Sequence, residues 1–243
     1  MKIKSKTMLG VSLFAMTFSF GATAQTCKPV PSCESLGYTK TSCSGDTIKC
    51  PFDTNKMYCI EKCPLLCEVG YIYYSDDTCS SKVISGKTPI GVVFDSNRQL
   101  VVSLDSVLKP WNDGSANWKE VSGLKNYDDS STAQQDFNGK SNTDTIVAFA
   151  KSSGQTQQAA QYCHDKTTAG KIWYLPALGE IRLMATNYST VNTSLSKVGE
   201  EFDHLWSSTE ASDSAWYMYP RNGYANNYLR NHYSPVRCIF SYE

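Results

Sequence analysis

Cysteine is the residue type with the greatest chemical potential in this sequence, because thiols form disulfides, bind metals and act as nucleophiles. The 243-residue chain has ten cysteines, and eight of them fall between residues 27 and 79. These eight are Cys27, Cys33, Cys43, Cys50, Cys59, Cys63, Cys67 and Cys79. Zinc ligands usually come in C-x2-C pairs or with histidine, and this stretch has neither. A short, even set of cysteines in a segment poor in aliphatic residues predicts a disulfide framework, whose pairing the sequence leaves open.

The residues that could support catalysis do not form a recognisable set. His164, His204 and His232 are scattered, and neither a G-x-S-x-G nucleophile motif nor a phosphate-binding glycine loop is found. An acidic cluster at residues 200–203 is expected to be a solvated turn. We therefore predict that the protein is not an enzyme, that it has no cofactor, and that it has no metal site.

The tripeptide motif Trp111-Asn112-Asp113 also occurs in calcium-dependent lectins, where the Asn and Asp bind the ion. Calcium requires six to eight oxygen ligands, and the proline-containing partner motif of those lectins is missing. The tripeptide lies in a stretch from 111 to 142 that is rich in Asn, Asp, Gly and Ser. We interpret this stretch as a long surface excursion and the tripeptide as a chance occurrence.

The segment 219–233 is the strongest candidate for a binding surface. Rigid aromatic rings mixed with Asn and Arg are typical of protein recognition surfaces, and sugars also stack on such rings. The predicted ligand-binding residues are Tyr219, Arg221, Asn222, Tyr224, Asn226, Asn227, Tyr228, Arg230, Asn231 and Tyr233. Trp206, Trp216 and Tyr217, just before this segment, are expected to be core residues of buried strands.

The start of the chain predicts export. Three lysines within residues 2–6 precede an apolar run from Met8 to Gly21, and Ala22-Thr23-Ala24 has the form of a cleavage site. The run is short for a membrane span, so residues 1–24 are interpreted as a signal peptide, with no membrane anchor left after cleavage. The mature protein would be periplasmic, on the cell surface or secreted. Basic and acidic residues are balanced at 23 each, which argues against a nucleic-acid partner.

Two regions follow the signal peptide: a cysteine-rich disulfide module at 25–82 and a larger domain at 83–243. Within the module, two segments, 33–43 and 67–79, each begin with Cys-Glu, contain Gly-Tyr and end in cysteine, a pattern typical of small hairpins closed by cystines. The larger region alternates strand-like and helix-like patterns, which predicts an α+β domain.

The strand patterns of the domain are at 90–94, 100–104 and in four runs after residue 204. A mainly helical segment is expected at 145–166, with Gly154 as an interruption, and another helix from Pro176 to Tyr188. Strands therefore close the chain and carry the predicted binding segment.

Four sequence blocks carry a family resemblance: WYLPALGEI (Trp173–Ile181), LWSSTE (Leu205–Glu210), AWYM (Ala215–Met218) and VRCI (Val236–Ile239). Together they resemble the Lcl C-terminal-type domain, the ligand-binding end of a collagen-like bacterial adhesin. That family belongs to the formylglycine-generating-enzyme-like branch of the C-type lectin fold. The resemblance covers residues 86–243 and implies a compact C-type-lectin-like domain.

The resemblance also implies that the blocks around Cys163 and Cys238 pack together, which predicts a disulfide between them. The enzymes of that fold branch use two closely spaced cysteines, whereas these two are 75 residues apart. The favoured hypothesis is an exported adhesin or binding protein whose partner is a glycan or a protein. The alternatives are a target-binding protein diversified by a retroelement and, less favoured, a formylglycine-generating-like enzyme.

Overall fold

The computed structural model describes residues 47–50, 53–59, 67–113 and 120–242. The predicted signal peptide and Cys27, Cys33, Cys43 and Cys63 lie outside these residues. The first described element is an antiparallel pair of strands, β1 (Thr47–Cys50) and β2 (Asp53–Cys59).

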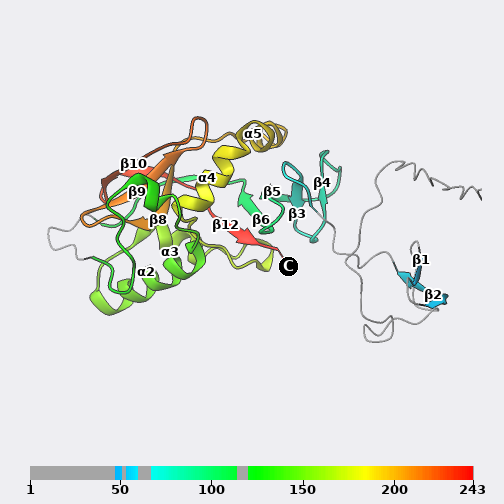
Figure 1. Cartoon of the computed structure of the whole chain (residues 1–243), viewed down its shortest axis with the longest axis horizontal. Coiled ribbons are helices and arrows are strands. Elements are labelled where there is room, and N and C mark those ends of the chain that lie inside the picture. Colours follow the sequence, from blue (N-terminus) through cyan, green and yellow to red (C-terminus); the bar gives the residue numbers. More distant parts are fainter. Residues whose placement is uncertain (1–46, 51–52, 60–66, 114–119, 243) are drawn as a thin grey trace, which may run out of the picture.

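The central element of the domain is a five-stranded antiparallel sheet in the order β12-β6-β5-β3-β4. Its strands are β3 (Ile72–Tyr74), β4 (Cys79–Ser80), β5 (Pro89–Asp95), β6 (Leu100–Ser103) and β12 (Ile239–Ser241). The last strand pairs with β6, so the two ends of the domain meet in one sheet (Figure 1). The hairpin expected at 90–104 is confirmed as β5–β6.

The position of β3 and β4 corrects the domain boundary expected at residue 82. The disulfide between Cys67 and Cys79 closes their hairpin, as the repeated Cys-Glu pattern predicted. However, β3 also pairs with β5, and the Tyr73 ring packs 5.3 Å from that of Phe240. Residues 67–80 therefore belong to the domain rather than to a separate cysteine-rich module.

Both faces of this sheet are buried, which explains why its strands are continuously apolar. Val92, Phe94 and Val102 face one core, and Val93 and Val101 face the other. The first core is completed by helices α4 (Leu178–Thr186) and α5 (Tyr188–Ser196). The second is completed by α2 (Gly139–Ser153) and α3 (Gln158–His164).

The helical segment expected at 145–166 is present as two helices. Gly154 ends α2 in the left-handed conformation, with φ of +72°, and its N–H donates to the Ala150 carbonyl. A short helix, α1 (Ser130–Ala133), and a 3-10 turn at Thr168–Gly170 complete the helical elements. Among the described residues, none of the helices combines the length and apolarity needed to cross a bilayer.

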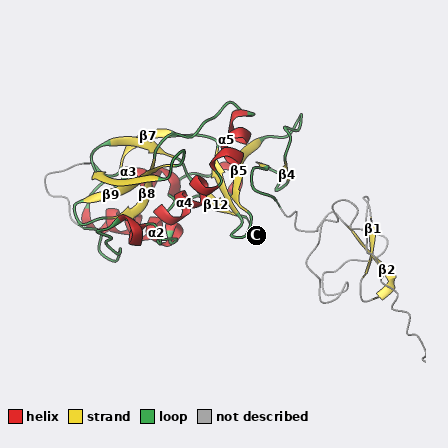
Figure 2. Cartoon of the chain, turned by 45° about the horizontal axis from the view of Figure 1, so that its top comes forward, coloured by secondary structure: helices red, strands yellow, loops and turns green. Residues whose placement is uncertain are grey.

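Five further strands form the part of the domain that carries the predicted binding segment. A three-stranded sheet has the order β10-β9-β8, with β8 (Leu205–Glu210), β9 (Ser214–Tyr219) and β10 (Tyr224–Leu229). A two-stranded ribbon pairs β7 (Val107–Pro110) with β11 (Tyr233–Val236). Helix α4 contacts both the β10-β9-β8 sheet and β5 of the central sheet (Figures 1 and 2). The domain is thus a mixed α+β fold built on antiparallel sheets.

The disulfide expected between Cys163 and Cys238 is present, with Cα atoms 5.4 Å apart. Both cysteines are fully buried. Cys163 lies on α3 and Cys238 directly precedes β12, so the bond joins a covering helix to the central sheet.

The two disulfides of the domain are expected to differ in their contribution to stability. In the chain-entropy model, the bond between Cys163 and Cys238 closes a 75-residue separation and contributes about 4 kcal/mol, against about 3 kcal/mol for the 12-residue separation of Cys67 and Cys79. Urea unfolding of the two Cys→Ala double variants measures both losses. A larger loss for the shorter loop would contradict this order.

A buried acid lies at the start of α4. Glu180 is 4% exposed, and its carboxylate accepts the Ala177 N–H at 2.7 Å and the Tyr174 hydroxyl at 3.3 Å. A Cβ on Gly139 would come within 2.1 Å of this carboxylate, so only glycine allows α2 to begin here. Burial raises the pKa of Glu180 to about 8, although both hydrogen bonds favour the charged form.

This raised pKa predicts a pH dependence of stability. Between about pH 5 and pH 8 the folded protein keeps the Glu180 proton, whereas the unfolded chain, with a pKa of 4.5, releases it. The free energy of unfolding of the wild type should therefore fall as pH rises through this range. Relative to Glu180→Gln, the fall should be about 2 kcal/mol or more, measured by urea unfolding at several pH values. A pH-independent difference between the two proteins would refute it.

Candidate ligand-binding surface

The β9–β10 hairpin places aromatic side chains on one face of its sheet. The antiparallel register sets Tyr224 opposite Tyr219 and Asn226 opposite Tyr217. Because side chains alternate along a strand, Tyr228 shares this face with them. We call these five residues the aromatic face.

The opposite face of the hairpin is part of the core. Trp216 and Met218 are buried there beside Leu178 and Ile181 of α4. The Trp216 indole N–H donates to the Tyr127 carbonyl at 2.9 Å. This packing fixes the backbone that carries the aromatic face.

The rings of the aromatic face continue outward from a buried tryptophan. Trp206 is fully buried on β8, and its ring centroid lies 6.0 Å from that of Tyr217. The Tyr217 and Tyr219 ring centroids are 5.9 Å apart. Tyr219 is in turn 6.3 Å from Tyr224 and 5.0 Å from His204. Burial raises the pKa of Tyr217 at the inner end of this row.

His204 was not among the predicted site residues, because a single histidine carries no local signal. Its ring tilts toward Tyr219, and Nδ1 lies 3.0 Å from the Asp203 carboxylate. That contact holds the imidazole at the border of the aromatic face. Burial acts to raise the pKa of Asp203, but the hydrogen bonds and charge of His204 outweigh it. The pKa of Asp203 therefore lies below its usual range.

Most of the predicted ligand-binding residues are accessible. Tyr219, Tyr224, Tyr228 and Tyr233 are 37%, 52%, 47% and 63% exposed. Arg221, Asn222, Asn226 and Asn231 are exposed as well. The structure does not, however, gather all of them on one surface.

Three predicted residues lie away from the aromatic face. Asn227 is half-buried and points to the side of Trp216, its cross-strand partner. Tyr233 lies on β11, opposite Pro110 of β7, and so belongs to the other ribbon. The third, Arg230, is only 3% exposed.

The prediction that Arg230 binds a ligand directly is therefore wrong. Its guanidinium pairs with the Glu210 carboxylate at 2.5 Å, and both side chains are buried. It also donates to the Ala211 carbonyl at 2.9 Å, and it lies over the Trp111 ring, 5.0 Å from the ring centroid. Burial raises the pKa of Glu210, with Arg230 and the Val121 N–H acting against that effect. Such a charge must be paired inside the protein, so this arginine serves the fold.

Trp111 and Asn112 also differ from expectation, since both are buried rather than part of a surface excursion. The Trp111 indole N–H donates to the Ser207 carbonyl at 2.8 Å. The Asn112 backbone N–H donates to the Arg230 carbonyl at 3.0 Å. Trp111 and Asn112 of the lectin-like motif are thus part of the packing around Arg230, whereas Asp113 is exposed.

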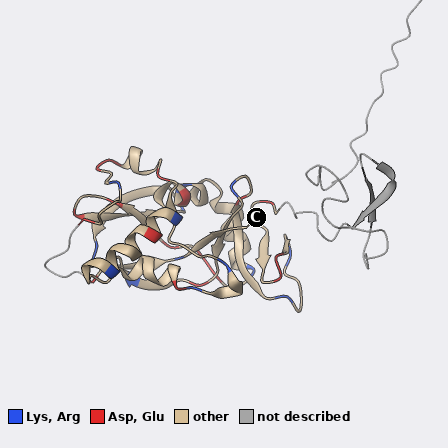
Figure 3. Ribbon diagram, turned by 90° about the horizontal axis from the view of Figure 1, so that it is seen from below, with Lys and Arg blue, Asp and Glu red and all other residues tan. Residues whose placement is uncertain are grey.

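Charges of both signs are interspersed along the ribbon of the domain (Figure 3). Within the described ranges, no group of three or more His, Cys, Asp or Glu side chains is arranged to hold a metal ion. The aromatic face offers rings, amide groups and hydroxyl groups, which recognise ligands by stacking and hydrogen bonding.

No family model and no curated protein match the chain. Among solved structures, it is similar to a fimbrial protein from Bacteroides ovatus ATCC 8483, with 17% sequence identity and a TM-score of 0.57. The match covers 72% of this chain and 49% of the fimbrial protein, so this chain corresponds to about half of that protein's length. At this identity the likeness concerns the fold alone.

The contrast between Arg230 and Arg221 predicts separate effects on stability. Arg230→Ala leaves Glu210 buried without its partner and should lower the free energy of unfolding by about 3–5 kcal/mol. Arg221→Ala, at an exposed position of the same segment, should change it by less than about 0.5 kcal/mol. Urea unfolding of both variants tests this, and equal effects would contradict the structural role of Arg230.

Proposed function

We propose that this protein is an exported binding protein of the adhesin type, whose aromatic face contacts a glycan or a protein. The observation that carries the proposal is the row of partly exposed rings on a hairpin whose other face is buried. Rings held in this way lose little conformational entropy on binding and cover a large area. The Asn226 amide, which donates to the Tyr224 hydroxyl at 3.2 Å, adds an adaptable hydrogen-bonding group.

Export is supported by the disulfides and by the first residues of the chain. Cys67–Cys79 and Cys163–Cys238 are bonds of the kind that persist in oxidising compartments. The lysine-rich start, apolar run and Ala-Thr-Ala site are those of a signal peptide. The fold likeness to a protein described as fimbrial agrees with a role at the cell surface.

Binding is favoured over catalysis, and membership of the Lcl C-terminal-type group remains part of the proposal. Cys163 and Cys238, the two cysteines of the region resembling that group, are joined in a buried disulfide. A thiol pair of the formylglycine-generating kind would need both as accessible thiols. The four blocks that carry the resemblance coincide with β8, β9, the start of α4 and the chain around β12.

The aromatic face is tested by removing its exposed rings. The triple variant Tyr219→Ala, Tyr224→Ala and Tyr228→Ala should keep a melting temperature close to that of the wild type, since these rings are 37–52% exposed. Its binding on a glycan array and a host-protein array should weaken by about tenfold or more for each ring that is a hot spot. Unchanged binding to every array ligand would overturn the proposal.

Two control variants separate binding from folding. Leu108→Ala removes a side chain that is 66% exposed on β7, a strand outside the β10-β9-β8 sheet, and should leave binding unchanged. Trp206→Ala empties a fully buried position and should destabilise the domain by about 3–5 kcal/mol. Unfolding of the triple tyrosine variant would show instead that its rings belong to the core.

A further inference from the structure

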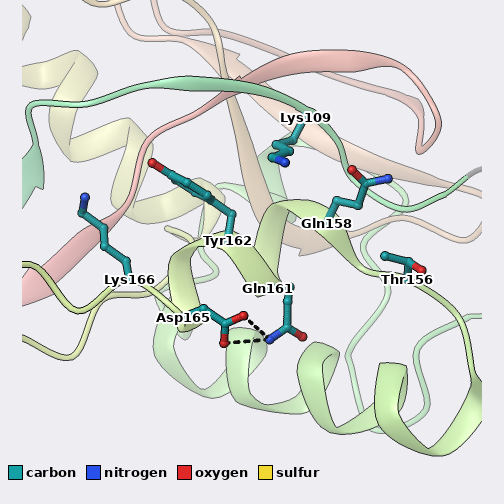
Figure 4. A pocket seen from close by; sticks show the side chains of 7 residues that line it. All are labelled: Lys109, Thr156, Gln158, Gln161, Tyr162, Asp165 and Lys166. Carbon is teal, nitrogen blue, oxygen red and sulfur yellow. Dashed lines mark hydrogen bonds between the residues drawn. The ribbon is translucent and has the colours of Figure 1, made fainter.

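A second recessed site lies between β7 and α3, separate from the aromatic face. It is a cavity of about 400 Å³ open to solvent, and its walls are mostly polar side chains. Figure 4 shows Lys109 reaching across from β7 toward side chains of α3. A cavity of this size holds a small ligand such as one or two sugar rings.

One wall of this groove is fixed before any ligand arrives. The Tyr162 hydroxyl donates to Asp105 at 2.5 Å, and the Lys166 ammonium donates to both oxygens of the same carboxylate at 2.8 Å. Although burial opposes it, these donors hold the pKa of Asp105 below its usual range. Asp105 thereby neutralises Lys166 and locks the Tyr162 ring. Cys163, the next residue on α3, is tied to Cys238 and anchors the helix itself.

A second wall presents a carboxylate with free acceptor capacity. Both oxygens of Asp165 accept from the Gln161 amide at 2.8 Å, which orients the carboxylate along α3. Its Oδ1 also lies 3.1 Å from His164 Nδ1. The side chain is 62% exposed, so Oδ2 can accept a further hydrogen bond from the solvent side. Oδ2 can therefore accept a hydrogen bond from a sugar hydroxyl group.

The opposite side of the groove is cationic. Within the described part of the chain, no carboxylate lies at ion-pair distance from the Lys109 ammonium. Gln158 lines the same cavity (Figure 4). The site thus combines a cationic group, a carboxylate oxygen that can accept from a hydroxyl, and the Tyr162 ring.

We propose that this groove binds an acidic saccharide unit, a hexuronic acid. The sugar carboxylate pairs with Lys109 and accepts from Gln158. A ring hydroxyl donates to Asp165 Oδ2, and the sugar ring packs beside Tyr162. This is a second ligand site, and it does not depend on the aromatic face.

Calorimetric titration of the full chain with glucuronate, glucose and acetate tests the assignment. Glucuronate should bind with a Kd of about 1 mM or tighter, and glucose and acetate should each bind at least about tenfold more weakly. Lys109→Gln should remove the preference for glucuronate over glucose, since it removes the charge but keeps a polar side chain that is only one bond shorter. Asp165→Asn should weaken the binding of both sugars.

Lys197→Gln is the matched control, because Lys197 is an exposed lysine on another part of the domain. It should leave the titration unchanged, as should the triple tyrosine variant of the aromatic face. The assignment is overturned if glucuronate does not bind, if acetate binds equally well, or if Lys109→Gln behaves like the control. Loss of glucuronate binding in the triple tyrosine variant would also overturn it, by placing the sugar on the aromatic face.

Discussion

A guanidinium and a carboxylate that are both removed from water hold the end of the aromatic hairpin in place. Arg230 follows β10 directly, and Glu210 ends β8, so their contact fixes the two outer strands of the sheet relative to each other. Neither charge is tolerable alone in such an environment. The surroundings therefore have to supply donors and acceptors: the Val121 N–H for Glu210 and the Ala211 carbonyl for Arg230. The Trp111 ring packs against the Arg230 guanidinium. Because Trp111 directly follows β7, this contact also links β7 to the ion pair.

The same logic of shared packing explains why the domain begins earlier than its composition indicates. β3 has only three residues, yet all three are buried, and its neighbour β5 would otherwise have an uncovered edge in the sheet. The Cys67–Cys79 bond stabilises a hairpin that is too short to persist alone. Cysteine density marks this hairpin as part of an N-terminal module, whereas hydrogen bonding assigns it to the domain.

Sequence patterns predicted those elements whose periodicity or punctuation is local. The apolar runs at 90–94 and 100–104 predict strands, which the structure buries on both faces. Gly154 interrupts the predicted helical segment because it adopts the left-handed conformation. The sequence likewise predicted that the tyrosines of β10 are exposed, because polar asparagines are interspersed with them. The burial of Trp111 and Arg230 could not be predicted in this way. Both lie in polar stretches, and their partners are on strands about 20 to 100 residues away in sequence. The groove between β7 and α3 could not be predicted from the sequence for the same reason. Its residues Lys109 and Tyr162 are distant in sequence and belong to no motif.

The alternation of side chains along β10 also bears on how the proposed binding surface could arise. Positions 224, 226 and 228 point away from the core, so their side chains can change without altering the packing of Trp216 and Met218. A segment diversified throughout residues 222–234 would also vary position 230, where the buried Glu210 carboxylate requires a cation. It would vary Ser234 too, which is 2% exposed beside β7. The fold thus permits variation at every second position of β10 and constrains position 230, directly after the strand. This argues for changes at individual exposed positions rather than replacement of the whole segment.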